Sequence, residues 1–167
     1  NYDNENYEYS FNKVNSEIYN ESPNIRFFQP DSTFGKTLEY DLMKSNPCQE
    51  ILLTESMSNY DEMKDLISLY NDSKPLNVLI DKLSTSDTNT NIKTSLQVIS
   101  SDHPIWTEAE LKKALISSRY LNSISKGEHA LQLSIKLLEN LDIKPNEDYV
   151  DLVIPSYIKD ALEWICQ

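Results

Sequence analysis

Apolar residues recur three and four positions apart through most of the chain, the spacing of residues on one face of an α-helix. The clearest example is the stretch 124–141, in which Leu131, Ile135 and Leu138 recur four and three positions apart. We expect this row to face the protein core. The same spacing predicts further helices at 34–42, 47–57, 60–70, 76–83, 92–99, 107–120 and 156–165.

Two short apolar runs interrupt the helical pattern. Residues 25–29 lie between Pro23 and Pro30, and residues 150–154 end at Pro155. A short apolar run bounded by turn residues is typical of a buried strand. The chain therefore reads as a strand, a long helical stretch, a second strand and a last helix, which predicts a helix-rich α/β domain. Within the helical stretch, a cluster of Ser, Thr, Asp and Asn at 84–91 predicts a loop.

Two of the expected helices begin with the pattern of a capping box, in which a Ser or Thr hydroxyl and a Glu three residues later satisfy backbone N–H groups. Thr107 and Glu110 form one pair, and Ser125 and Glu128 form the other. Single polar residues are expected to cap two more helices, namely Asp31 or Ser32 before 34–42, and Ser156 before the last helix.

The chain has only two glycines, and each is next to a lysine at an expected helix start. Gly35 precedes Lys36, and Gly127 follows Lys126. Lys126 falls at the positive end of the helix dipole, where a lysine costs stability. A solvated surface lysine is the ordinary explanation, and a role in a functional site is the alternative.

Length and charge limit the classes of function. A chain of 167 residues is long enough for one domain with a core. The formal net charge of −12, from 15 basic and 27 acidic residues, would repel a phosphate backbone. Clustered carboxylates can hold a hard cation such as Mg²⁺, although solubility is the commoner reason for an acidic surface.

The two cysteines and the hydropathy indicate in which cellular compartment the protein is expected. Cys48 and Cys166 are far apart and have no histidine at metal-ligand spacing, so we expect packing residues in a reducing, cytoplasmic protein. No apolar run approaches about 18 residues, so no membrane segment is expected.

The two histidines have different expected positions. His103, before a proline, is expected to be a surface residue, whereas His129 could face the same space as Lys126 or be solvated.

The sequence lacks the motifs of the common nucleotide and metal sites. It contains no G-x-x-x-x-G-K-[ST], no G-x-G-x-x-G, no C-x-x-C, no H-E-x-x-H and no D-x-D pair. These motifs therefore indicate no complete active site within this sequence.

Three short motifs occur in a fixed order: KTLEYDL at 36–42, KGEHA at 126–130 and VIPSYIKDALEWI at 153–165. Together they resemble the C-terminal half of the Toprim domain of the OLD-family (overcoming lysogenisation defect) ATP-dependent endonucleases. The resemblance runs from about residue 24 to the last residue. It implies a partial Toprim-type α/β fold, with Toprim portions at 23–46 and 102–167, a helical insertion at 47–101, and an acidic, Asn- and Tyr-rich leader at 1–22.

The resemblance also implies a function. Lys126 matches the lysine that assists phosphodiester cleavage, and Glu39 is the candidate ligand of a Mg²⁺ or Mn²⁺ pair. The family's first Toprim glutamate, its aspartate pair and its ATP-binding domain would lie upstream. The resemblance therefore implies a fragment of a DNA endonuclease, with phage defence as a candidate role. The fragment is expected to be inactive alone, to join an upstream ATPase/Toprim half and to form a homo-oligomer.

Two other interpretations stay open. The chain could be a non-catalytic helical module for dimerisation or partner docking, or a small acidic regulator. The ordinary explanation for Glu39 is a surface carboxylate paired with Lys36 three residues earlier. Glu128 and His129 could likewise be functional or serve only as capping and surface residues.

Overall fold

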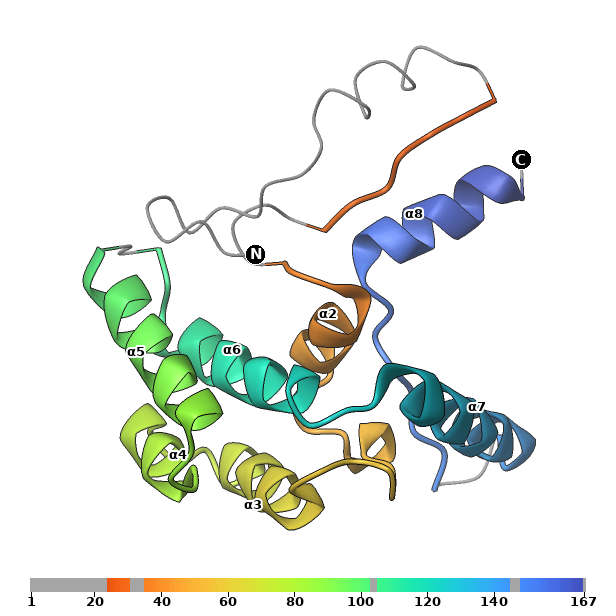
Figure 1. Ribbon diagram of the computed structural model, residues 1–167. Helices are drawn as coiled ribbons and strands as arrows, with labels where there is room; N and C mark the ends of the chain where they lie inside the picture. The colour runs from red at the N-terminus through yellow and green to blue at the C-terminus, as the bar shows by residue number, and fades with distance from the viewer. Residues whose placement is uncertain (1–23, 31–34, 103–104, 145–147, 167) are drawn as a thin grey trace.

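The computed structural model describes residues 24–30, 35–102, 105–144 and 148–166, and the regular elements in these ranges are all helical (Figure 1). In chain order they are α2 (Leu38–Ser45), the 3₁₀-helix η1 (Glu50–Leu52), α3 (Tyr60–Asn71), α4 (Leu76–Lys82), α5 (Asp87–Asp102), α6 (Glu108–Leu121), α7 (Lys126–Asp142) and α8 (Ser156–Ile165). None of these helices combines the length and the hydropathy needed to cross a membrane.

The prediction of a partial Toprim-type α/β fold is wrong for the described residues, because neither expected strand forms. Residues 150–154 have no regular secondary structure, and two asparagine side chains bond backbone groups that a neighbouring strand would bond in a sheet. Asn140 accepts from the N–H of Val150 at 2.9 Å and donates to its carbonyl at 2.8 Å, and Asn46 bonds both backbone groups of Val153, at 2.7 and 2.9 Å. The backbone groups of Val150 and Val153 are thus satisfied without a sheet.

The other expected strand, residues 25–29, is not a buried element either. Ile25 and Phe27 are 42% and 45% exposed, and the segment has no regular secondary structure. Prolines bound irregular segments as often as they bound strands. A short apolar run between two prolines therefore does not distinguish a strand from an irregular segment.

Helix α6 is the centre of the core. It packs against α2, α3, α4 and α5, and its Leu115, Ile116 and Tyr120 are at most 1% exposed (Figure 1). Met43 of α2 and Leu66 of α3 are fully buried in the same core. A central helix of this kind is buried on most sides, so even its polar Ser117 is fully enclosed.

The face of α7 that packs against the core is not the face that the apolar spacing predicts. Leu131, Ile135 and Leu138 are 63%, 50% and 62% exposed, whereas His129 and Leu133 are buried. Helix α7 carries apolar residues on two faces, and some of its polar residues are buried. The hydropathy pattern therefore does not show which face packs against the core.

Several helix starts differ from the predicted ones. The hydroxyl of Thr107 accepts from the N–H of Glu110 at 3.3 Å, which is one half of the expected capping box. Ser125 precedes α7 but its side chain makes no capping bond, so the second box is absent. Helix α2 begins at Leu38 with Thr37 as its cap, and Pro155 takes the cap position before α8.

Other segments depart from the sequence pattern in smaller ways. The predicted helix at 47–57 reduces to η1, and the predicted loop at 84–91 contains the start of α5, where the Ser86 hydroxyl accepts from the N–H of Asn89 at 3.1 Å. Cys48 and Cys166 are exposed rather than packed. The leader at 1–22, the caps expected at 31–32 and His103 lie outside the described residues.

Candidate functional site

The two residues that the resemblance singles out are neighbours in the structure. The Nζ of Lys126 lies 3.5 Å from Oε1 of Glu39, and the two side chains are 65% and 27% exposed. Lys126 is the first residue of α7 and Glu39 the second residue of α2, so the first turns of two helices meet at this point. We call this pair of side chains the Lys126–Glu39 site.

The Glu39 carboxylate is held in its ionised form. Burial opposes ionisation, but hydrogen bonds from the backbone of Glu39 and from the Thr37 side chain, together with the charge of Lys126, outweigh it and lower the pKa of Glu39. An ionised and partly exposed carboxylate beside an exposed ammonium group can contact an anionic substrate, a cation or both.

A buried imidazole lies one turn after Lys126. His129 is 2% exposed, its Nδ1 is 2.8 Å from Oγ1 of Thr54, and its Nε2 is 2.5 Å from the hydroxyl of Tyr120. The rings of His129 and Tyr120 meet edge to face with centroids 5.3 Å apart. These contacts join the first turn of α7 to the end of α6 and to the loop after η1, and so fix where Lys126 emerges.

Electrostatics keep this network neutral. Burial lowers the pKa of His129, the charge of Glu39 acts in the opposite direction, and Lys136 adds to the lowering. Burial, and after it the negative charge of Glu39, raises the pKa of Tyr120. A neutral imidazole between two hydroxyls can donate to one and accept from the other. The sequence allows either a solvated position for His129 or one that faces the same space as Lys126. In the structure His129 is buried, one turn after Lys126 in α7.

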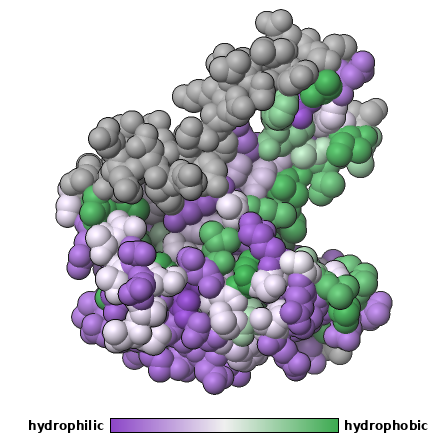
Figure 2. Space-filling view, viewed as in Figure 1, coloured by the Kyte–Doolittle hydropathy of each residue, from purple (hydrophilic) through white to green (hydrophobic). Residues whose placement is uncertain are grey.

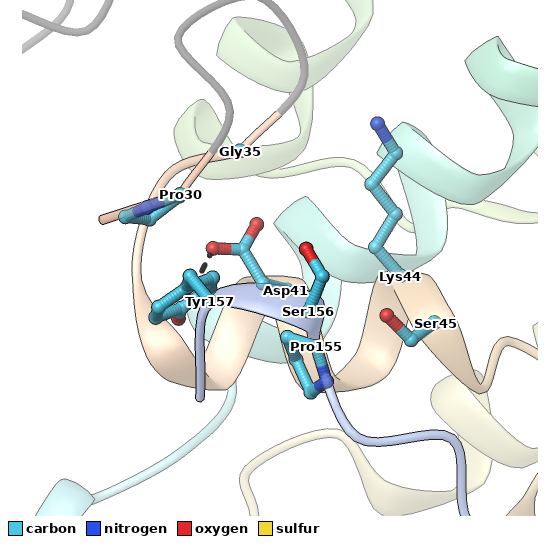
Figure 3. Close-up of a pocket in the computed structure, with 8 residues that line it drawn as sticks. All are labelled: Pro30, Gly35, Asp41, Lys44, Ser45, Pro155, Ser156 and Tyr157. Carbon is cyan, nitrogen blue, oxygen red and sulfur yellow. Dashed lines mark hydrogen bonds between the residues drawn. The ribbon is translucent and has the colours of Figure 1, made fainter. Parts of the chain in front are cut away.

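Asp41, the other acidic residue in the KTLEYDL motif, holds neighbouring segments of the fold together. It is 7% exposed, and it accepts from the backbone N–H of Lys36 at 3.1 Å and from the Tyr157 hydroxyl at 3.4 Å. Burial raises the pKa of Asp41, while the bond from Lys36 and the charge of Lys44 oppose the rise. Figure 3 shows the Tyr157 hydroxyl directed at this carboxylate.

The pocket beside Asp41 is small, about 160 Å³, and lies between α2 and the start of α8. Pro155 and Ser156 form one wall of it, and Gly35 forms part of another (Figure 3). Because both oxygens of Asp41 are used to tie α8 and the segment before α2 together, Asp41 is poorly suited to bind a metal ion as well.

The Lys126–Glu39 site fits part of a metal site. Glu39 offers the hard oxygen ligand that Mg²⁺ and Mn²⁺ prefer. In the part of the chain that the structure describes, no group of three or more His, Cys, Asp or Glu side chains could hold a metal ion. Glu39 would therefore be one ligand in a set completed by other residues.

Comparison with protein-family models, with curated proteins and with solved structures found no match for this chain.

Proposed function

We propose that this chain supplies a catalytic lysine and a metal-binding carboxylate to a divalent-metal-dependent DNA endonuclease of the OLD type. The observation that carries the proposal is the 3.5 Å contact between Lys126 and Glu39. The two residues come from separate motifs, far apart in the chain, and only the fold brings them together.

The local chemistry fits the two roles. Lys126 is exposed, it stands at a helix N-terminus, and the Ser125 side chain does not cap the first backbone N–H groups of α7. Ammonium and backbone N–H groups together can stabilise the charge that develops on a phosphate during cleavage. The ionised Glu39 would help to hold Mg²⁺ or Mn²⁺, which when bound activates water and neutralises the leaving oxygen.

The proposal assigns the remaining parts of the enzyme to other regions. An upstream ATPase/Toprim half would donate the further metal ligands and bind ATP, and the assembly would act in the cytoplasm as a homo-oligomer. With a net charge of −12, this chain would leave most of the DNA contacts to that half.

The test is nicking of supercoiled plasmid by the full-length protein in Mn²⁺. Lys126→Ala is expected to lower the rate by about 100-fold or more, while the free energy of unfolding changes by less than about 1 kcal/mol, because the ion pair is exposed.

Lys159→Ala is the matched control. Lys159 is also in the first turns of a helix, is 69% exposed and pairs with Glu163 at 3.7 Å. Its loss should leave nicking unchanged. If Lys126→Ala nicks at the rate of Lys159→Ala, the catalytic role of Lys126 is wrong.

A non-catalytic docking module is the second candidate, and the exposed apolar face of α7 favours it. A module would retain partner binding while showing no metal-dependent nicking in the intact protein.

A further inference from the structure

A second cavity lies between helix α7 and the loop that follows η1. Its volume is about 400 Å³, against about 160 Å³ for the pocket beside Asp41. Pockets that hold small molecules enclose about 300–1,000 Å³. We call this cavity the α7 pocket. The loop contributes residues 53–55 to its walls, α3 contributes its first residue, Tyr60, and α7 contributes Gln132, Ile135 and Lys136.

Hydrogen bonds between the loop and α7 hold the walls of the α7 pocket in place. The Nζ of Lys136 donates to the carbonyl of Leu53 at 2.5 Å, and Oε1 of Gln132 accepts from the N–H of Ser56 at 3.0 Å. Between them Thr54, 2% exposed, bonds the buried imidazole of α7 at 2.8 Å. The pocket is therefore formed before a ligand arrives, which lowers the cost of binding one.

Two opposite charges line the α7 pocket without pairing with each other. Among the residues that the structure describes, the carboxylate of Glu55 has no salt bridge or hydrogen bond, and the ammonium group of Lys136 donates to the Leu53 carbonyl alone. The two groups thus face the same space but lie too far apart for an ion pair. A molecule that carries both an ammonium group and a carboxylate can pair with both of them.

The remaining walls fit the other parts of such a molecule. Because Oε1 of Gln132 is used by the loop, the amide N–H groups of this side chain can donate to a carboxylate beside Lys136. The Tyr60 ring and Ile135, which is 50% exposed, offer apolar surface. Figure 2 shows apolar surface over α7. An apolar side chain of the ligand would remove part of this surface from water.

The charges around the α7 pocket favour a ligand with an ammonium group over a simple anion. Glu128 and Glu139 are exposed on α7, one turn before and one turn after the lining residues. Lys64, one turn after the start of α3, pairs with Glu50 at 3.6 Å, so these two charges largely cancel. The surroundings are therefore acidic, and Lys136 is the cation in the wall that can hold a carboxylate.

We propose that the α7 pocket binds a free α-amino acid with an apolar side chain. The carboxylate of the ligand lies against Lys136 and the Gln132 amide, its ammonium group against Glu55, and its side chain against Tyr60 and Ile135. The α7 pocket shares no residue with the Lys126–Glu39 site, so this inference does not rest on the proposed nuclease function.

The first test is calorimetric titration of the full-length protein with L-leucine, L-methionine and L-phenylalanine. At least one of them should bind with one site per chain. Its N-acetyl derivative lacks the ammonium group and its amide lacks the carboxylate, so each should bind about 10-fold or more weakly. No binding of all three amino acids, or equal binding of an amino acid and both derivatives, would overturn the proposal.

The second test assigns each charge of the ligand to its residue. Glu55→Gln should remove the preference for the amino acid over its N-acetyl derivative, and Lys136→Met should remove the preference over its amide. Lys159→Met and Glu163→Gln, at an exposed pair on α8, are the controls and should keep both preferences.

Glu55→Gln decides the outcome, because Glu55 is exposed and its carboxylate has no partner in the described part of the fold, so the melting temperature should be unchanged. Lys136→Met also removes the bond to the Leu53 carbonyl. A full preference over the N-acetyl derivative in Glu55→Gln would overturn the proposal. A dipeptide with the same first residue that binds as tightly as the amino acid would overturn it too, since the pocket would then hold a peptide N-terminus.

Discussion

The buried ion pair between Arg119 of α6 and Glu62 of α3 offers the sharpest test of the fold. The two side chains are 4% and 10% exposed, and the guanidinium Nε donates to Oε1 of Glu62. Glu62 also accepts from the backbone N–H of Ser84 at 2.8 Å and from the Asn89 amide at 3.4 Å. Removing the guanidinium leaves a carboxylate in a site that water hardly reaches.

We expect Arg119→Met to lower the free energy of unfolding by about 3 kcal/mol, the lower end of the range for breaking a buried pair. The lower end applies because Ser84 and Asn89 still satisfy the carboxylate, and because methionine refills part of the volume. For a chain of this size the loss corresponds to a melting temperature lower by about 6–12 °C. Urea unfolding at pH 7, followed by circular dichroism, measures the change.

The control is an exposed pair with a short contact. Lys82 and Asp65 approach to 2.6 Å, but their side chains are 43% and 52% exposed. Lys82→Met should therefore cost less than about 1 kcal/mol. If Arg119→Met and Lys82→Met cost the same, burial does not govern the strength of these pairs and the packing of α3 on α6 is wrong.

The same pair predicts a pH dependence. Burial opposes the ionised form, but bonds from Ser84 and the pairing with Arg119 outweigh it and lower the pKa of Glu62 from 4.5. A carboxyl with a lowered pKa stabilises the fold fully above its unfolded pKa, and this contribution is lost as the pH falls through the folded pKa. The gap between wild type and Arg119→Met should therefore shrink when the urea series is repeated below pH 4.5; a constant gap would contradict the assignment.

Three further predictions concern the core, the orientation of α7 and the thiols. Tyr120→Phe removes the hydroxyl bound to the buried imidazole and should cost about 1–3 kcal/mol in urea unfolding; no loss would mean that this hydrogen bond is absent. Leu115→Ala should cost about 2–5 kcal/mol, since Leu115 is fully buried, whereas Leu138→Ala should cost far less, and equal losses would show that α7 is turned the other way. Cys48 and Cys166 are exposed, so both should react with Ellman's reagent in the native protein as fast as in the unfolded one, and slow reaction of either would contradict the fold.

The spacing of apolar residues was sufficient to predict a helix and its buried face where one face is plainly apolar. The helix predicted at 60–70 forms as α3, and its Met63 and Ile67 are fully buried. The helix predicted at 107–120 forms as α6, with Thr107 as its cap. In both, the local signals and the packing agree.

Periodicity failed where two faces compete or where side chains replace a sheet. Helix α7 buries His129 and Asn140, which a hydropathy pattern assigns to solvent. Asn140 and Asn46 bond the backbone of Val150 and Val153, and such side-chain bonds between distant residues leave no local trace in a sequence.

The sequence alone predicted only some of the residues in the candidate site. The motifs indicated Lys126 and Glu39 separately, and only the folded structure shows that the first turns of α2 and α7 bring these two side chains together. Thr54 and Tyr120, which hold His129 beneath the site, come from segments with no recognisable motif. Their roles depend on three-dimensional neighbours that periodicity does not encode.

The most direct test of the central claim, that Lys126 and Glu39 form one metal-dependent site with separate roles, is to measure Mn²⁺ affinity and plasmid nicking together in the full-length protein. Glu39→Gln should weaken Mn²⁺ binding by about 10-fold or more and reduce nicking. Lys126→Ala should abolish nicking while Mn²⁺ binds as tightly as before or more tightly, because a neighbouring positive charge is removed. Wild-type nicking by Lys126→Ala, or wild-type Mn²⁺ affinity in Glu39→Gln, would contradict the claim.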